Sequence, residues 1–258
     1  MNLFGLTDRG LIRKENQDSY DIWLKEDTML AVVCDGMGGA LSGNVASSMT
    51  TEIFSDCMRN LGEETPSTAM LEALEQANEQ VFCRSVDDPK CAGMGTTIVA
   101  AYIQPDWHTT VLNVGDSRAY LIRYDHITQI TRDHSLVADL VEKGKITPEQ
   151  ARTHPNKNII TRAVGTEAHT PGDIYELDLV PGEYVLLCSD GLSNVVTEQE
   201  IQFEVIFGGE IDTCCQRLLD IALERGAPDN VTIVLATVGI IDNDVDLDEF
   251  EEGGADRG

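Results

Sequence analysis

Six short apolar runs, each of the length of a buried β-strand, limit what this chain can fold into. They lie in adjacent pairs joined by short turns such as Tyr124-Asp125-His126, and they do not alternate strictly with single helices. This grouping favours antiparallel sheets flanked by helices over a doubly wound parallel sheet, so we expect an α+β fold. The predicted strands are Leu30–Cys34, Gly95–Tyr102, Thr109–Val114, Ala119–Arg123, Tyr184–Cys188 and Val231–Val238.

Apolar residues recur every three or four positions in two segments between the first two strands. This periodicity predicts helices over Asn44–Leu61 and Ser67–Phe82. Capping boxes beginning at Thr147 and Thr197 mark the starts of two further helices. A last helix is predicted over Leu218–Arg225.

The charge balance excludes several classes of partner. With 45 acidic and 18 basic residues, the chain carries a formal charge of −27. Such a chain lacks the clustered cations that bind nucleic acid or an anionic membrane surface. The longest apolar run, Val231–Ile241, is too short to span a bilayer. With no signal peptide and no C-x-x-C pair among seven cysteines, we expect a cytoplasmic protein without membrane insertion.

One compositional break divides the chain. No repeat or linker interrupts residues 1–241, which we predict to form a single domain. Residues 242–258 hold eight acidic residues and one Arg, and we expect this acidic tail to be disordered.

Aspartates stand where the apolar runs begin or end. Asp35 and Asp190 follow apolar runs and precede Gly. Asp116 directly follows the run Val-Leu-Asn-Val-Gly, and Asp229 precedes the last apolar run. Each alone has an ordinary explanation as turn chemistry. Four together would repel one another strongly unless divalent cations compensate their charge. The pattern therefore predicts a carboxylate-rich metal site.

The segment Gly-Leu-Ile-Arg-Lys-Glu-Asn-Gln-Asp brings Arg13 and Asp18 five residues apart. In an extended stretch both could face one cleft, Asp18 toward a metal and Arg13 toward a phosphate as a planar bidentate donor. The alternative is a surface Arg13 paired with Glu15 or Asp8.

Six ordered motifs, GLIRKENQD, VVCDGMGG, AGMGTT, VGDSRAYL, LLCSDGL and APDNVT, carry a resemblance. Together they resemble the motifs of the metal-dependent type 2C serine/threonine protein phosphatases, most closely the compact bacterial members. The resemblance implies a β-sandwich of two antiparallel sheets with paired helices outside. It also implies two tightly bound Mn²⁺ or Mg²⁺ ions at one end.

The resemblance assigns ligands to the two ions. Asp35 would bridge them, Gly36 would offer its carbonyl, Asp190 and Asp229 would hold one ion, and Asp18 would reach the other through water. The family's reaction is hydrolysis of phosphoserine and phosphothreonine by water activated between the two ions.

The remaining motif positions have supporting roles in the family. Arg13 matches the phosphate-binding Arg, so that Arg13, Asp35 and Asp190 are the expected catalytic residues. Asp116 matches a ligand of a third, weaker ion, and Asn230 would orient the loop or a metal-bound water.

Two departures from the family concern the general acid. Met37 and Ala40 stand where some members have His, which leaves protonation of the leaving group unassigned, with a metal-bound water as the leading candidate.

Residues 133–165 resemble the flap beside the active site of bacterial members. Its cations are either a solvated face or a positive rim that admits phosphoproteins. They are Lys143, Lys145, Arg152, Lys157 and Arg162.

The expected partners are phosphorylated proteins, the substrates of a serine/threonine kinase and the kinase itself. A second hypothesis is a catalytically inactive module of the same fold that binds phosphoproteins. Retention of Asp18, Asp35, Asp190 and Asp229 favours the enzyme.

Overall fold

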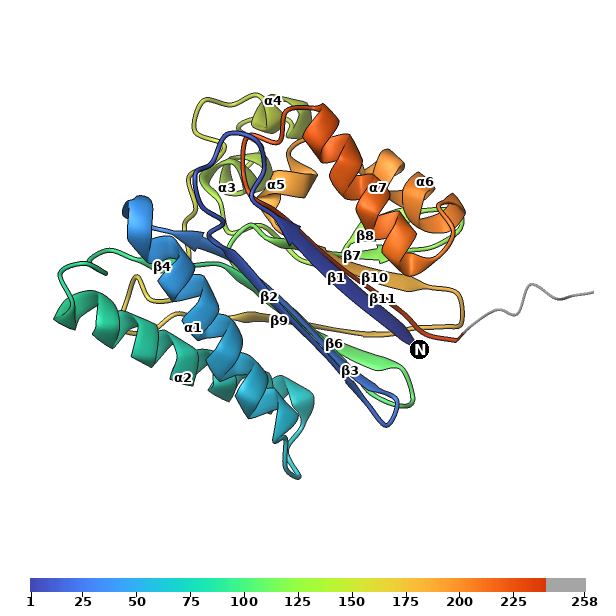
Figure 1. Cartoon of the computed structure of the whole chain (residues 1–258), viewed down its shortest axis with the longest axis horizontal. Helices are drawn as coiled ribbons and strands as arrows, with labels where there is room; N and C mark the ends of the chain where they lie inside the picture. Colours follow the sequence, from blue (N-terminus) through green and yellow to red (C-terminus); the bar gives the residue numbers. More distant parts are fainter. Residues whose placement is uncertain (240–258) are drawn as a thin grey trace, which may run out of the picture.

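The computed structural model describes residues 1–239, without the side chains of residues 39–41. The predicted acidic tail, and with it the domain boundary at residue 241, lies outside the described residues. The chain folds into two stacked antiparallel sheets with a pair of helices on each outer face (Figure 1). The predicted α+β class and the two-sheet architecture are confirmed.

The first sheet has the order β1-β11-β10-β7-β8. Its strands are β1 (Asn2–Asp8), β7 (Arg118–Ile122), β8 (Ile127–Gln129), β10 (Tyr184–Cys188) and β11 (Val231–Thr237). The second sheet has the order β2-β3-β5-β6-β9, with β4 paired to β3. Its strands are β2 (Asp18–Lys25), β3 (Thr28–Met37), β4 (Gly95–Thr96), β5 (Ile98–Ile103), β6 (His108–Val114) and β9 (Asp173–Asp178).

Seven helices occur among the described residues. α1 (Gly39–Arg59) and α2 (Pro66–Asp87) cover the second sheet, whereas α6 (Glu198–Phe207) and α7 (Ile211–Glu224) cover the first (Figure 1). α5 (Asp190–Ser193) is a single turn after β10. α3 (Leu136–Glu142) and α4 (Pro148–Arg152) form a flap that projects from the sandwich.

The central strands are apolar on both faces because both faces are covered. In β3, Ala31 and Val33 point into the layer between the sheets, whereas Leu30 and Val32 pack against α1 and α2. The other sheet repeats the arrangement, with its outward face packed on α6 and α7. This double burial explains why the predicted strands read as continuous apolar runs.

The predicted strand Gly95–Tyr102 is divided into β4 and β5, and the other predicted elements are present, most with shifted ends. α1 begins five residues before the predicted start, because Gly38, at φ 117°, turns the chain directly from β3 into the helix. Both capping boxes form, at Thr147 and at Thr197. The short helices α3 and α5 were not predicted. Neither were β1, β2, β8 and β9, whose residues are mostly half-buried and mixed in polarity. Among the described residues, no helix is both long and apolar enough to cross a bilayer.

Candidate active site

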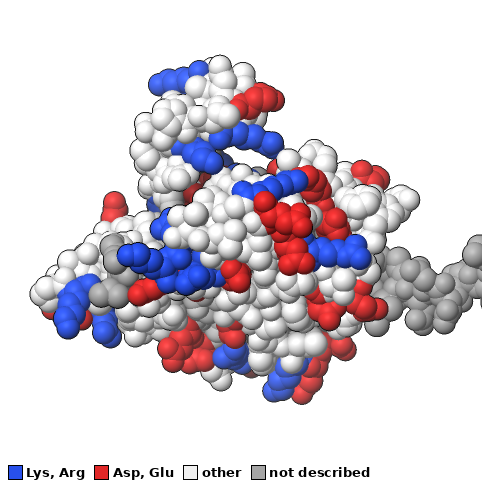
Figure 2. Space-filling model, turned by 45° about the horizontal axis from the view of Figure 1, so that its top comes forward, with Lys and Arg blue, Asp and Glu red and all other residues white. Residues whose placement is uncertain are grey.

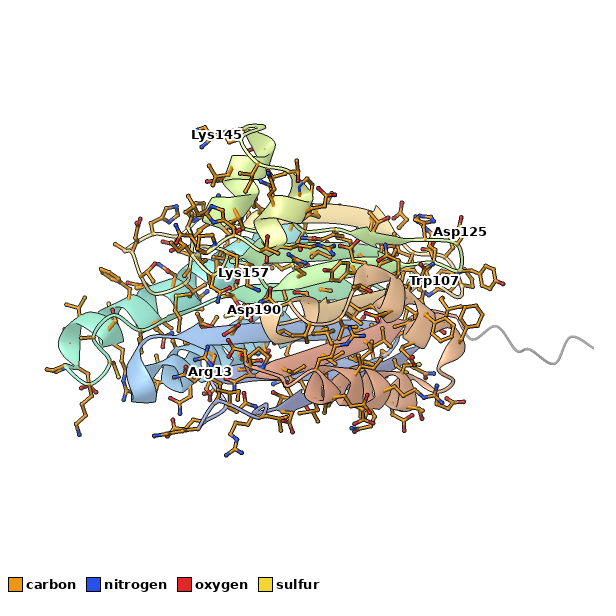
Figure 3. All side chains as sticks on the ribbon, turned by 90° about the horizontal axis from the view of Figure 1, so that it is seen from above. Arg13, Trp107, Asp125, Lys145, Lys157 and Asp190 are labelled. Atoms are coloured by element: carbon orange, nitrogen blue, oxygen red, sulfur yellow. The ribbon has the colours of Figure 1, made fainter. Side chains whose placement is uncertain are left out.

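The aspartates singled out by the sequence come from both sheets and meet at one end of the sandwich. Asp18 begins β2 and lies directly opposite Asp35 of β3. Asp116 follows β6, Asp190 opens α5, and Asp229 precedes β11. Figure 3 places Arg13, Asp190 and Lys157 near one another, whereas Trp107 and Asp125 lie at the far end. Asp35 lies inside β3 and not after it, since the strand continues to Met37.

Asp18 is fixed by two hydroxyl donors from the opposite sheet. Its Oδ2 accepts hydrogen bonds from Ser189 Oγ at 2.7 Å and Thr232 Oγ1 at 2.6 Å. Its Oδ1 is buried and has no hydrogen-bond partner. One carboxylate oxygen is thus held by the protein, and the other faces the site without a donor.

The backbone around Asp35 and Gly36 is closely packed. The Asp35 amide donates to Thr97 Oγ1 at 2.9 Å, and the Thr97 amide donates to the Asp35 carbonyl at 2.9 Å. A Cβ on Gly36 would lie 2.1 Å from the Gly43 carbonyl oxygen. Close packing alone therefore requires glycine at position 36, whatever its carbonyl binds.

Asp190 lies between the cluster and the flap. Its Oδ2 accepts a hydrogen bond from Asn194 Nδ2 at 2.9 Å, and its Oδ1 is buried without a partner. Burial and the Asp229 carboxylate raise the pKa of Asp190, and Lys157 of the flap, whose Nζ lies 3.5 Å from Asn194 Oδ1, offsets part of that rise. The flap can therefore influence Asp190 through Lys157.

Arg13 reaches the cluster through Asp229. Its guanidinium donates to Asp229 Oδ2 at 2.6 Å, so neither Glu15 nor Asp8, the partners of the alternative hypothesis, takes this position. Residues 9–17 form a bent loop and not the extended stretch that we expected. The Arg13 side chain is half exposed, which leaves part of the guanidinium free to meet a ligand.

Asn230 fixes this loop. Its Nδ2 donates to the carbonyls of Arg9 at 2.8 Å and Glu15 at 3.0 Å, and its Oδ1 accepts from the Gln17 amide at 2.8 Å. Of the two roles expected for Asn230, the hydrogen bonds correspond to orientation of the loop.

Burial and mutual repulsion raise the pKa values of the cluster. Burial raises the pKa of Asp18 and of Asp116 to about 7 and that of Asp190 to about 6. The pKa of Asp35 also lies well above its usual range, first because of burial and then because of the carboxylates of Asp18 and Asp190. Without a counter-charge the cluster therefore ionises unfavourably near neutral pH.

The donor set fits hard divalent cations. The two orphaned Oδ1 atoms of Asp18 and Asp190 are buried acceptors without donors, which is the environment that a cation satisfies. Within residues 1–239, no three acidic, histidine or cysteine side chains already surround one point as a complete ligand set. A ligand set made of side chains alone leaves out two of the expected contacts. They are the Gly36 carbonyl and the water-mediated contact of Asp18. Asp229, moreover, is engaged by Arg13.

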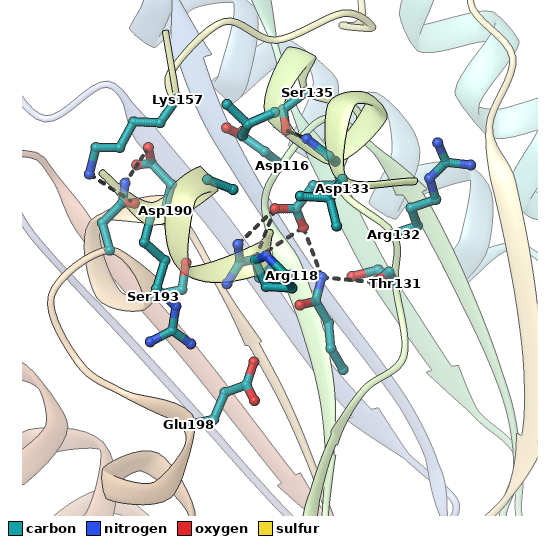
Figure 4. A pocket seen from close by; sticks show the side chains of 18 of the residues that line it. Asp116, Arg118, Thr131, Arg132, Asp133, Ser135, Lys157, Asp190, Ser193 and Glu198 are labelled. Carbon is teal, nitrogen blue, oxygen red and sulfur yellow. Dashed lines mark hydrogen bonds and ion pairs between the residues drawn. The ribbon is translucent and has the colours of Figure 1, made fainter. Parts of the chain in front are cut away.

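Asp116 does not pair with Arg118, two residues further along the Gly-Asp-Ser-Arg turn, as an ordinary turn aspartate could. Arg118 Nη2 instead donates to Asp133 Oδ2 at 2.7 Å, and its Nε bonds both Asp133 oxygens. The Asp116 side chain is buried beside Asp190 and lines the same pocket (Figure 4). Its carboxylate therefore faces the site.

The sequence reasoning missed His134, which supports the Asp116 turn. The Gly115 amide donates to His134 Nδ1 at 3.0 Å, and the His134 amide donates to the Gly115 carbonyl at 2.8 Å. On the other side, His134 Nε2 lies 3.0 Å from Asp173 Oδ2. The only signal in the sequence is the Asp-His-Ser tripeptide at the start of the flap, which predicts no such contact.

The flap cations differ in their surroundings. Figure 2 shows Lys and Arg on the flap, which projects at the top of that view. Arg162 belongs to neither a rim nor a solvated face, because it donates to Asp173 Oδ1 at 2.6 Å and to the Pro171 carbonyl at 3.2 Å. Lys143, Lys145 and Arg152 are exposed, and Lys157 is half-buried next to Asn194.

Comparisons with known proteins agree on one family. Residues 13–218 match the family described as protein phosphatase 2C. The chain is 36% identical to the serine/threonine phosphatase stp of Listeria innocua, over 89% of this chain and 92% of that protein.

Solved structures give the same result. The crystal structure of the serine/threonine phosphatase Stp1 from Staphylococcus aureus has a TM-score of 0.87 and 35% identity, over 92% of this chain and 95% of that one. The catalytic domain of the serine threonine protein phosphatase PstP, in complex with two manganese ions, has a TM-score of 0.82 and 32% identity, over 93% of this chain and 98% of that one.

Proposed function

Because the chain belongs to the protein phosphatase 2C family, we propose that it hydrolyses phosphoserine and phosphothreonine in proteins at the carboxylate cluster described above. It is a serine/threonine protein phosphatase, a phosphoric monoester hydrolase. The observation that carries the choice of site is that Asp18, at the start of β2, and Asp190, at the start of α5, each have a buried Oδ1 without a hydrogen-bond partner.

We assign the expected metal ligands to this cluster. Asp35, Asp190, Asp229 and the Gly36 carbonyl would hold two divalent cations, with Asp18 acting through water. When bound, divalent cations supply the positive charge and the acidity that hydrolysis of a phosphomonoester needs. The manganese ions of the PstP structure support metal dependence; the choice between Mn²⁺ and Mg²⁺ is left to experiment.

The residues of the chain itself hold and orient the reactants. Asn230 fixes the loop that carries Arg13, and Asp229 holds the guanidinium at the edge of the cluster. The exposed part of that guanidinium would take phosphate oxygens as a planar donor. Ser189 and Thr232 hold Asp18 in a single orientation.

Arg13→Ala is expected to raise KM for p-nitrophenyl phosphate by roughly tenfold to a hundredfold, with a smaller change in kcat. The substitution removes a charge-assisted contact to the substrate phosphate. Steady-state kinetics at saturating Mn²⁺ measures it, with Arg84→Ala, on the exposed face of α2, as the matched control. An unchanged KM would show that Arg13 is a surface residue that does not bind the substrate phosphate.

Asp116→Ala is expected to lower kcat and the activation at millimolar Mn²⁺ while two tightly bound ions remain. A single buried carboxylate with few neighbouring donors makes a weak site for a third ion. Calorimetric titration and kinetics on the same variant check this. If thermal stability falls and the Mn²⁺ dependence of kcat does not change, Asp116 only shapes its turn.

We further propose that the substrates are products of a serine/threonine kinase, and that the kinase itself is one of them. The predicted cytoplasmic location agrees with such substrates. Nothing in the described residues favours the inactive binding module, since all four metal-site aspartates are present.

The test of the proposed function is metal-dependent turnover. Release of phosphate from p-nitrophenyl phosphate and from a phosphothreonine peptide should require Mn²⁺ or Mg²⁺ and stop with EDTA. A protein that binds the phosphopeptide without hydrolysing it in either metal would be the inactive module.

A further inference from the structure

A pocket of about 670 Å³ extends from the carboxylate cluster under the flap. Asp116 and Asp190 line its end next to the cluster, and Ser193 and Glu198 line the wall formed by α5 and the start of α6 (Figure 4). The facing wall belongs to α3 and α4 of the flap. The pocket is therefore continuous with the site where we place the substrate phosphate.

The flap wall carries an apolar patch, next to Glu142 and Arg152, that the core does not cover. Val137, Ala138 and Val141 of α3, with Pro148 and Ala151 of α4, line the pocket, and neither helix has a buried residue. The helices are nonetheless held in place at their base. The Leu136 amide donates to the Ile159 carbonyl at 2.9 Å, and Arg132 binds Glu142 and Asp139 on α3. The apolar wall is thus preformed.

The polar groups on the pocket floor already have partners. Arg118 bonds both oxygens of Asp133. Gln129 donates to Asp133 Oδ1 and to the Thr131 carbonyl, each at 2.8 Å. A polar side chain that reaches this part of the floor would find Arg118, Gln129 and Asp133 already bonded to one another. Among the described residues, the polar groups of the lining without such a bond include Asp190 Oδ1, next to the cluster, and Arg152 of α4. An apolar side chain would displace water without leaving a floor group unpaired.

We propose that this pocket holds an apolar side chain of the substrate protein, close in sequence to the phosphorylated residue. The proposal rests on the proposed phosphatase function. An extended chain rises about 3.3 Å per residue, so a side chain within three residues of the phosphoresidue can reach the flap from the cluster. Val137, Val141 and Ala151 are then the residues that determine this preference.

The test uses phosphothreonine peptides of Gly and Ser in which a single Leu moves from three residues before the phosphothreonine to three residues after it. One or two positions should raise kcat/KM roughly 5- to 50-fold over the Leu-free peptide, as expected for an apolar side chain that fills a pocket. Equal values within twofold at all six positions would overturn the proposal.

Two variants locate the contact. Val141→Asn, which makes the wall polar, should reduce the ratio between the best Leu peptide and the Leu-free peptide to about one, and Ala138→Phe, which fills the pocket, should do the same. Val86→Asn, at a position of α2 that is 67% exposed, is the matched control and should leave the ratio unchanged. A ratio that survives in both flap variants would contradict the proposal.

The positive charge of the flap is a competing explanation for any difference in kcat/KM among the peptides. Arg152 lines the pocket and has no ion-pair partner among the described residues. Arg152→Gln should leave the Leu preference intact, and its loss in that variant would overturn the apolar assignment. Wild-type turnover of p-nitrophenyl phosphate distinguishes failure of the proposed phosphatase function from failure of the pocket proposal. If it is absent, the proposed function fails; if it is present without a Leu preference, only the pocket proposal fails.

Discussion

Asp35→Asn is expected to lower kcat by about a thousandfold or more and, at the same time, to raise the melting temperature of the metal-free protein. Asp35 is in the centre of the cluster, and the carboxylates of Asp18, Asp190, Asp116 and Asp229 all raise its pKa. Replacing it by a neutral isostere removes a central ligand and also the charge on which the repulsion converges.

The pH dependence of this gain follows from the direction of the pKa shifts. The folded carboxylates have pKa values near 6 to 7 for Asp190, Asp18 and Asp116, above those of an unfolded chain. The folded metal-free protein therefore binds more protons than the unfolded one between about pH 4 and pH 7, and it loses stability as the pH rises through that range. The gain in melting temperature should be larger at pH 8 than at pH 5.

Differential scanning fluorimetry in EDTA at both pH values measures the stability, and steady-state kinetics in Mn²⁺ measures the turnover. Asp87→Asn is a matched control, since Asp87 is exposed at the end of α2. Substantial turnover in Asp35→Asn would contradict the assignment of Asp35 to the metal centre. If metal-free Asp35→Asn melts at a lower temperature than the metal-free wild type at pH 8, repulsion among the carboxylates does not destabilise the protein.

Gly191→Ala is expected to lower the melting temperature by roughly 10 °C or more and to abolish most activity. A Cβ on Gly191 would lie 1.8 Å from the Asn230 carbonyl oxygen and 3.4 Å from Val231 Cα. These are backbone atoms at the start of β11, so the chain itself would have to move. The movement would separate Asp190 from Asp229, the two carboxylates expected to hold the same ion.

Gly62→Ala provides the control, because no atom lies within 4 Å of a Cβ built there. Thermal unfolding and kinetics on both variants test the claim. If Gly191→Ala unfolds and reacts like the wild type, the close approach of these two segments is not required.

The fold could be predicted to a large extent because the buried strands are uniformly apolar and the helices periodic. Because the strands are apolar on both faces, the sequence does not indicate which residues point between the sheets and which point toward the helices. In β3, Leu30 and Ala31 look alike in the sequence, yet they lie in different layers. The outer strands β1 and β9 were missed because their half-buried, mixed residues give no clear period.

The local sequence indicates some residues of the candidate site and gives no sign of others. The aspartates could be found because each stands next to an apolar run, so the local sequence carries the signal. Arg13 and Asp229 are 216 positions apart, and no local pattern predicts their ion pair. The contacts of His134 with Gly115 and Asp173 likewise arise only when the flap base packs against β6 and β9.

A calorimetric Mn²⁺ titration of the chelator-stripped protein at pH 7.5 decides whether these carboxylates hold catalytic divalent cations. We expect about two tightly bound ions per chain, with phosphatase activity returning in parallel with their binding and neither process occurring in Asp35→Asn. Phosphate release by the stripped protein without added metal, or tight Mn²⁺ binding that persists unchanged in Asp35→Asn, would contradict it.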